Sequence, residues 1–234
     1  MRISRTIAMQ ILAAGFALSQ GAAVRAAEQP LTVVELFTSQ GCSSCPPANA
    51  NLIELARGRK ILVLSFSVTY WDYLGWKDTN GREEFTARQV VYEPALGLRG
   101  PFTPQMVFNG RTSAVGNNLP EARELISRAK PLDGPAIAVN RSSVEIGREH
   151  GFRQTADIWL VRYDPAVENV PVSRGENRGS TLAHTHVVHA LRHLGTYRGE
   201  AVRLKFPQAG QNLRTAVLLQ LPHGGALLSA GTDR

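Results

Sequence analysis

The sequence predicts two domains of different class, an α/β domain followed by a mainly β, sandwich-like domain. Three observations carry this prediction. An apolar run at residues 31–38 leads into the only two cysteines, Cys42 and Cys45, and then into a segment of helical periodicity. Strand-like and helical segments alternate as far as residue 130. Beyond a proline- and glycine-rich cluster at residues 131–135, only short strand-like runs follow.

Residues 1–26 have the composition of a secretory signal peptide. Arg2 and Arg5 precede an apolar block at residues 7–18, and small residues lead up to a cleavage site after Ala26. The mature protein is therefore predicted to be periplasmic or secreted. The apolar block is shorter than the roughly 20 residues that a membrane helix needs, and we predict no membrane span in the mature chain.

Charge and cysteine content narrow the class of partner. The formal net charge of +7 falls to +4 when Arg2, Arg5 and Arg25 leave with the signal peptide, and the remaining basic residues form no run. This pattern argues against a nucleic-acid partner. In an exported chain a pair of cysteines tends to oxidise, and two cysteines allow one disulfide.

The first elements form a βαβ unit. Residues 31–38 lack a clean alternation of apolar and polar side chains, which indicates a strand covered on both faces. Apolar residues at helical spacing follow at 52–56, and Gly58 ends that helix. Residues 61–68 read as a second buried strand, and a strand, helix and strand in this order predict a parallel pair.

The start of the helix decides where the two sulfurs lie. Pro46 and Pro47 fit a first helical turn, where their missing N–H groups are not needed. The residue before a proline is pushed away from helical geometry. Cys45 is therefore expected at the helix cap, with Cys42 in the loop before it.

The remaining elements of the first domain follow in the order of the thioredoxin fold. An aromatic loop at residues 69–80 leaves the carboxyl end of the second strand and lies at the same sheet edge as the cysteines, where open α/β sheets bind ligands. The segments after it are a helix at 82–92, a strand at 102–108, a return strand at 112–115 after the Asn109-Gly110 turn, and a helix at 120–130. The order β-α-β-α-β-β-α assigns residues 27–130 to a thioredoxin-like domain.

Residues 131–234 are predicted to form the β-rich domain. Turn signals such as Asp164-Pro165 and residues 222–225 separate its strand-like runs. The runs are at residues 136–140, 143–146, 157–163, 168–173, 181–194, 201–206, 216–221 and 226–229. Many short strands with frequent turns indicate a sandwich-like arrangement.

Four strings in this chain resemble an exported bacterial thioredoxin-like family catalogued as a domain of unknown function (family 1223). They are residues 33–47 (VVELFTSQGCSSCPP), residues 70–78 (YWDYLGWKD), Thr103-Pro104-Gln105-Met106 and Arg174-Gly175-Glu176-Asn177. The resemblance implies a thioredoxin-like first domain and no established activity. It also implies that Pro104 is a cis-proline whose loop, with Thr103, faces the dithiol and pairs with an extended substrate.

Cys42 and Cys45 are the candidate catalytic residues of a thiol–disulfide oxidoreductase. In this hypothesis the exposed thiolate of Cys42 attacks a disulfide, and Cys45 resolves the mixed disulfide. A helix N-terminus after the motif lowers the thiolate pKa. The partners are protein thiols or disulfides, and we predict no cofactor. The alternative is a non-catalytic module that binds a metal or a peptide and keeps a structural disulfide.

Glu35 is a third candidate catalytic residue, seven positions before Cys42. Thioredoxins keep a buried carboxylate nearby as proton acceptor for the resolving thiol, which needs hydrogen-bond reach directly or through one water. The alternative is a charged residue that caps a sheet edge.

Trp71, Asp72 and Trp76 are candidate substrate-binding residues in the aromatic loop, because aromatic side chains are favoured as anchors for a bound peptide. The alternative is that these rings pack the loop onto the second domain.

Four histidines gather at 184, 186, 189 and 193, and with two thiolates they suggest a zinc or copper site. His184 and His186 fit strand spacing, whereas 186, 189 and 193 fit helical spacing, so one element does not aim all four side chains together. We predict no metal.

Overall fold

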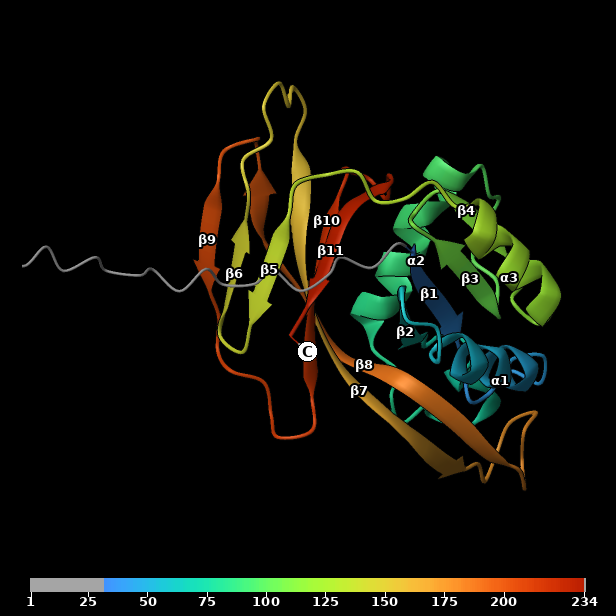
Figure 1. The fold of residues 1–234 in the computed structure, drawn as a ribbon. Coiled ribbons are helices and arrows are strands. Elements are labelled where there is room, and N and C mark those ends of the chain that lie inside the picture. The colour runs from blue at the N-terminus through green and yellow to red at the C-terminus, as the bar shows by residue number, and fades with distance from the viewer. Residues whose placement is uncertain (1–31, 234) are drawn as a thin grey trace, which may run out of the picture.

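The computed structural model describes residues 32–233. The predicted signal peptide, residues 1–26, lies outside them. In chain order the elements are β1 (Thr32–Thr38), α1 (Pro46–Leu55), β2 (Ile61–Ser67), the 3-10 helix η1 (Asp72–Leu74), α2 (Glu83–Leu96), β3 (Gln105–Phe108), β4 (Thr112–Ala114), α3 (Leu119–Arg128), β5 (Ile137–Asn140), β6 (Ser143–Ile146), β7 (Ala156–Pro171), β8 (Thr181–Tyr197), β9 (Val202–Lys205), β10 (Arg214–Gln220) and β11 (Leu227–Thr232). Figure 1 shows them.

The fold is mixed α/β, with one large mixed sheet and a separate antiparallel sheet. The large sheet has eight strands in the order β11-β10-β7-β8-β2-β1-β3-β4. Strands β1 and β2 pair in parallel, as predicted, and β3 runs antiparallel to β1. The sheet takes strands from both sides of residues 131–135, so those residues separate two kinds of element order within one continuous sheet. The domain boundary placed there stays a prediction.

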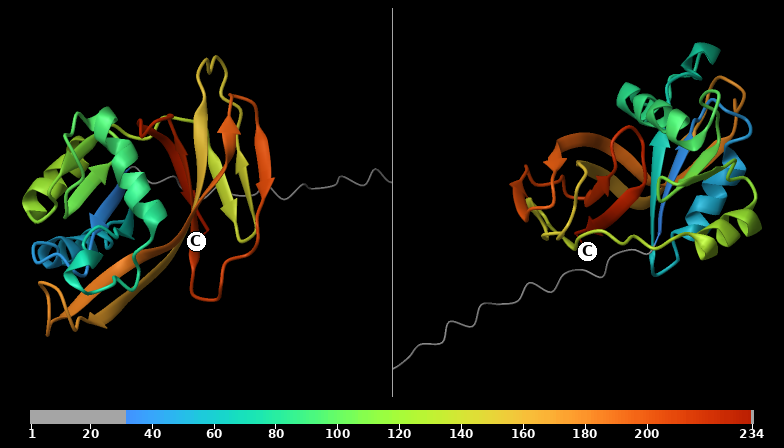
Figure 2. Two further views of the ribbon diagram at one scale, coloured as in Figure 1. Left: turned by 180° about the vertical axis from the view of Figure 1, so that it is seen from behind. Right: turned by 90° about the horizontal axis from the view of Figure 1, so that it is seen from above.

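The helices cover both faces of the β1–β4 region, because β1 is apolar on both faces. Val34 and Leu36 pack against α1 and α3, whereas Val33 and Phe37 share a core with α2. The right panel of Figure 2 shows α2 on one side of the sheet and the other two helices on the opposite side. Continuous burial along β1 confirms the strand covered on both faces.

The β-rich half pairs its small sheet with the far end of the large one. Strands β5, β6 and β9 form the three-stranded antiparallel sheet. Ile137 and Val144 from this sheet share a core with Leu160 and Val217 of the large sheet. Two sheets therefore enclose one apolar layer, as in a sandwich.

One sequence expectation in this half was wrong. The runs predicted at 157–163 and 168–173 are parts of a single strand of 16 residues, β7, which ends at Pro171, and its partner β8 has 17 residues. Asp164-Pro165 does not end the strand, because the chain absorbs it as a register shift and Asp164 accepts a hydrogen bond from the backbone of Ala166. The long hairpin extends to the side of α1, as Figures 1 and 2 show.

Candidate active site

The two cysteines lie where the sequence placed them, between β1 and α1. Cys45 occupies the N-cap position and α1 begins at Pro46. The Cys45 N–H donates to the Cys42 carbonyl at 3.2 Å, and the Cys42 N–H donates to Ser39 at 3.2 Å, so the motif forms two consecutive turns. Both cysteines are free thiols. The predicted helix start and the loop position of Cys42 are confirmed.

The Cys42 sulfur lies against the segment that precedes β3. It is 3.2 Å from Oγ of Ser44 and 3.8 Å from the carbonyl oxygen of Thr103. The Thr103–Pro104 peptide bond is cis. The expectation that Pro104 is a cis-proline whose loop faces the dithiol is therefore confirmed.

The two thiols have opposite pKa shifts. The pKa of Cys42 falls from 9.0 to about 6, first because the Cys45 thiol donates to its sulfur and then because Ser44 and Thr103 bond to it; burial opposes this shift. Burial raises the pKa of Cys45 well above its ordinary value, and the hydrogen bond to Cys42 and the charge of its thiolate raise it further. Near neutral pH the pair is one thiolate beside one thiol.

The helix N-terminus contributes less to the thiolate than the sequence suggested. Pro46 and Pro47 occupy the first helical positions, so two of the donors that a helix end normally offers are absent. The donors to Cys42 come instead from the thiol of Cys45 and from Ser44, through both its hydroxyl and its backbone N–H. The motif itself therefore supplies most of these hydrogen bonds, and Thr103 adds one more.

Trp71 orients Thr103 beside the sulfur. Its indole N–H donates to Oγ1 of Thr103 at 2.7 Å. Because that oxygen accepts from Trp71, its own hydrogen is free to point toward Cys42, and the Thr103 side chain lowers the Cys42 pKa. Of the predicted binding residues, Trp71 and Thr103 thus meet at the dithiol.

Asp72 and Trp76 support the neighbouring loop instead. The Trp76 indole donates to Oε1 of Gln40 at 2.9 Å, and Asp72 accepts a backbone hydrogen bond from Asp78 at 3.1 Å. A Cβ added at Gly175 would lie 3.7 Å from Cβ of Trp76. The packing of Trp76 beside the β-rich half is thus the alternative that its contacts favour.

Asp78 is a site residue that sequence reasoning missed. Its carboxylate accepts from the backbone N–H of Gln40 at 2.7 Å and of Asn80 at 2.9 Å. Burial raises its pKa to about 6, although these two hydrogen bonds oppose the shift. Asp78 belongs to the quoted string at residues 70–78, but nothing in that string distinguishes a buried aspartate from an exposed one.

The connection between β7 and β8, residues 172–180, covers the motif. The Asn177 amide donates to the carbonyl oxygens of Gln40 at 3.0 Å and Cys42 at 2.8 Å. Glu176 accepts from the backbone N–H of Ser43 at 2.9 Å, which lowers the pKa of its carboxyl. Nothing in the sequence indicated that this connection contacts the cysteines, although residues 174–177 are part of the resemblance to the family.

The expectation that Cys42 is exposed was wrong in this conformation. Cys42 and Cys45 both have 0% exposed area. The physical reason is tertiary: Thr103 lies against the sulfur, and Asn177, more than a hundred residues along the chain, binds the Cys42 carbonyl, contacts that the sequence spacing hides.

Glu35 lies on the other face of β1 from the helix that Cys45 caps. Side chains alternate along a strand, and the neighbours Val34 and Leu36 pack against α1 while Glu35 points toward α2. There it accepts from Nε of Arg88 at 2.6 Å and from the hydroxyl of Tyr92. The role of proton acceptor for Cys45 has no support from this position. The sheet-edge alternative was wrong, because β1 lies between β2 and β3.

The histidines of β8 are dispersed. His184 is buried, which lowers its pKa to about 4, His186 stacks on Tyr163, and His193 pairs with Asp157 at 3.1 Å. Within residues 32–233 no group of three or more His, Cys, Asp or Glu side chains is placed to hold a metal ion.

Among the same residues, 32–233, no helix is long and apolar enough to cross a membrane.

The comparisons with known proteins agree with the sequence resemblance. A family model described as Protein of unknown function (DUF1223) matches residues 33–220. The crystal structure of Protein AGR_C_4864 from Agrobacterium tumefaciens is similar, with a TM-score of 0.73 and 30% identity over 89% of this chain and 96% of that one. HBP35 of Porphyromonas gingivalis matches with a TM-score of 0.57 and 12% identity over 89% of this chain and 76% of that one, a likeness of fold alone. Among curated proteins none matches.

Proposed function

This chain belongs to the DUF1223 family of proteins of unknown function, and we propose that it is a thiol–disulfide oxidoreductase that acts through Cys42 and Cys45. We further propose that residues 27–130 are a thioredoxin-like domain and that the protein is exported through the leader at residues 1–26. The element order β-α-β-α-β-β-α and the cis bond before Pro104 support the domain proposal.

The observation that carries the proposal is the opposite shift of two adjacent thiols. The Cys42 pKa of about 6 gives a thiolate near neutral pH, and the raised pKa keeps Cys45 as a thiol that donates to it. The thiolate is the attacking species in disulfide exchange, so only one of the two sulfurs is prepared to attack. A pair that served only as a staple needs no such difference.

The reaction exchanges two electrons between two sulfur pairs. The Cys42 thiolate attacks one sulfur of a substrate disulfide, and the S–S bond of the substrate breaks. One substrate thiolate leaves and takes a proton from solvent. Cys45 then loses its proton to solvent and attacks Sγ of Cys42, which releases the second substrate sulfur as a thiolate that solvent protonates. The substrate disulfide is reduced and the Cys42–Cys45 dithiol is oxidised; the reverse sequence oxidises a substrate dithiol.

We propose that the connection at residues 172–180 moves when a substrate reaches Cys42. In the proposed reaction a substrate sulfur must reach a side chain that has no exposed area. The covering contacts are few: two hydrogen bonds from Asn177 and one to Glu176 hold the connection to the motif. Loops held by a few hydrogen bonds open at low free-energy cost compared with global unfolding.

The pH dependence of thiol reactivity tests this function. Iodoacetamide should alkylate Cys42 of the reduced protein with a half-maximal rate near pH 6, and the rate should fall at lower pH because the thiolate takes up a proton. Cys45→Ser should then trap a mixed disulfide with a disulfide-bonded peptide, whereas Cys42→Ser should trap none. Ser43→Ala is the matched control in the exposed part of the motif. A titration near pH 9 together with no trapped adduct would contradict the proposal.

The burial of Cys42 favours a second candidate, a peptide-binding module with a structural disulfide. The same trapping experiment separates the two. A structural disulfide would resist reduction by a glutathione buffer, whereas a redox couple equilibrates with it.

A further inference from the structure

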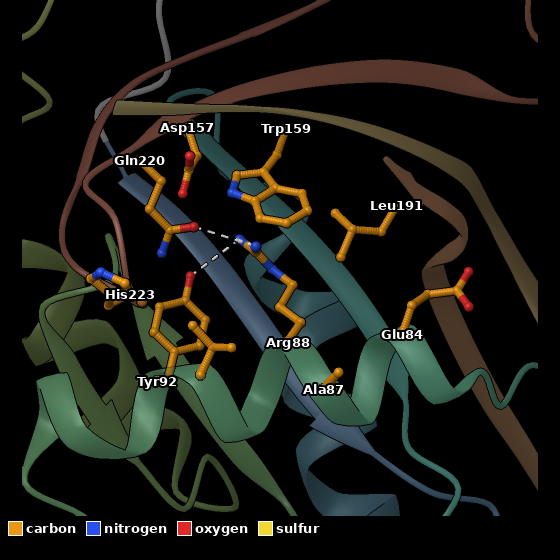
Figure 3. A pocket seen from close by; sticks show the side chains of 11 residues that line it. Glu84, Ala87, Arg88, Tyr92, Asp157, Trp159, Leu191, Gln220 and His223 are labelled. Carbon is orange, nitrogen blue, oxygen red and sulfur yellow. Dashed lines mark hydrogen bonds between the residues drawn. The ribbon is translucent and has the colours of Figure 1, made fainter. Parts of the chain in front are cut away.

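A cavity of about 210 Å³ lies between α2 and the strands β7, β8 and β10. Figure 3 shows it from close by. Its walls include Ala87, Arg88 and Tyr92 of α2, Trp159 of β7, Leu191 of β8 and Gln220 of β10. It is on the face of the sheet that carries α2, and the dithiol is at the start of α1 on the opposite face. This space is therefore separate from the proposed redox site.

The cavity lies beside Ala87, the one small side chain among the α2 residues that line it. Ala87 contributes one methyl group on the helix side, while the indole of Trp159 and the side chain of Leu191 form the opposite wall in Figure 3. Both of these residues are only partly buried although they pack against the main core. Apolar walls with a few placed polar groups are typical of small-molecule sites.

Arg88 provides a fixed hydrogen-bond donor inside this apolar space. Its guanidinium donates to Glu35 at 2.6 Å, to Gln220 at 3.3 Å and to Tyr92 at 3.2 Å. A guanidinium has five N–H donors, so two of them, one on each terminal nitrogen, have no bonded acceptor among the described residues. Figure 3 shows these nitrogens in the middle of the cavity, between Gln220, Tyr92 and Trp159.

The guanidinium is held in place on its flat faces as well. Its central carbon is 5.4 to 5.6 Å from the ring centroids of Phe66, Tyr92 and Trp159. The side chain is 4% exposed. A ligand that meets Arg88 therefore meets a donor that needs no reorganisation, which reduces the entropic cost of binding.

The charges around the cavity select an uncharged ligand. Glu35 already neutralises Arg88 at 2.6 Å, and the carboxylates of Glu84 and Asp157 also line the space. His193 pairs with Asp157, and His223 lies on the wall at the turn after β10. An anionic ligand would place a second negative charge beside Glu35, whereas a carbonyl oxygen accepts hydrogen bonds without adding one.

We propose that this cavity binds a small uncharged aromatic molecule whose carbonyl oxygen accepts hydrogen bonds from Arg88 and whose ring packs against Trp159 and Leu191. Any ligand of this class needs a flat apolar body and one uncharged hydrogen-bond acceptor. The site is independent of the dithiol chemistry, and Cys42→Ser/Cys45→Ser protein should bind the same molecule with unchanged affinity.

Benzamide and benzoate are the matched probes, because they differ chiefly in the charge of the acceptor group. Titration followed by saturation-transfer NMR on the full chain should show benzamide binding at least tenfold more tightly than benzoate. Ala87→Leu should weaken benzamide binding by at least tenfold, because the larger side chain fills the cavity. Leucine is a good helix former, so the change should not disturb α2. Ala95→Leu, at an exposed position of α2 outside the cavity, should leave binding unchanged.

Three results would overturn the proposal: no benzamide binding to the native chain, benzoate binding as tight as benzamide, or full binding in Ala87→Leu. Circular dichroism of each variant checks the fold. Leu191→Trp fills the cavity from the opposite wall and gives a second test if Ala87→Leu fails to fold. The redox assays do not depend on these outcomes, so failure of the cavity proposal leaves the dithiol proposal to its own experiment.

Discussion

Two buried polar groups lie on opposite faces of β1 and are held in different ways. On the α2 face, Glu35 and Arg88 form an ion pair. Four further residues surround it: Tyr92 and Gln220 through hydrogen bonds, and Phe66 and Trp159 through their rings. On the α1 face, Cys42 has weak sulfur contacts and depends on a distant connection for its cover. The first group is a buried ion pair with several hydrogen bonds, whereas the second is a thiol whose pKa of about 6 lies near neutral pH. The comparison shows how one strand supports a rigid core and a reactive loop.

The largest effect on stability is expected from removing one partner of the Glu35–Arg88 ion pair. Arg88→Met leaves the Glu35 carboxylate buried without its cation, and removal of one partner of a buried pair costs about 3–5 kcal/mol of unfolding free energy. The double variant Glu35→Gln/Arg88→Met removes both charges and should recover more than half of that loss. Urea denaturation measures both values. A single variant as stable as the native protein would show that the pair is not the rigid element of the comparison.

A smaller loss of stability is expected from changing Asn177, which holds the connection at residues 172–180 to the cysteine motif. Asn177→Ala removes two hydrogen bonds to carbonyl groups of the motif, which costs about 1–3 kcal/mol. The same change should speed iodoacetamide alkylation of Cys42 severalfold, because the connection at residues 172–180 is released. Arg178→Ala is the matched neighbour with an exposed side chain. Unchanged alkylation in Asn177→Ala would show that something else controls access.

Thr103→Val isolates the electrostatics of the thiolate. Valine has nearly the same shape but does not donate to the Cys42 sulfur, so the Cys42 pKa should rise from about 6 by roughly half to one unit. The midpoint of the alkylation rate against pH measures the shift. Thr112→Val, at an exposed position of β4, is the control. A midpoint that does not move would assign the low pKa to Cys45 and Ser44 alone.

The smallest effect is expected from Glu176→Gln. The glutamine oxygen still accepts from the Ser43 N–H, and the lost charge is fully exposed and screened by solvent. The alkylation rate of Cys42 should change by less than about twofold. A larger change would mean that the Glu176 charge, and not only its hydrogen bond, governs the thiolate.

The stability of the reduced protein adds a pH signature to the comparison. Cys42 has a folded pKa of about 6 and an ordinary value of 9.0, so between these values the unfolded chain binds more protons and stability rises with pH. That contribution is complete above pH 9 and is lost as pH falls through 6. Cys42→Ser should remove this slope in urea titrations. The contribution of Asp78 to stability has the opposite sign. Folding raises its pKa from 3.8 to about 6, so this contribution falls as pH rises between these two values.

Local sequence determined the order of elements and the place of the motif. The buried run of β1, the prolines that open α1 and the strand after it depend on hydrophobic pattern and backbone restriction over a few residues. For the same reason Cys45 is found at the N-cap, where the sequence placed it. The low helix contribution to the thiolate also follows from Pro46 and Pro47, once the helix is known to begin there.

Tertiary structure alone decided the rest of the site. Glu35 faces Arg88 because strand alternation and the packing of α2 set its direction, and the spacing to Cys42 carries no such information. Asn177 covers Cys42 because a single long hairpin replaces the short strands that the Asp164-Pro165 turn suggested. Sequence patterns report short-range periodicity, whereas burial and hydrogen bonding between residues 135 positions apart are set by the sheet that brings them together.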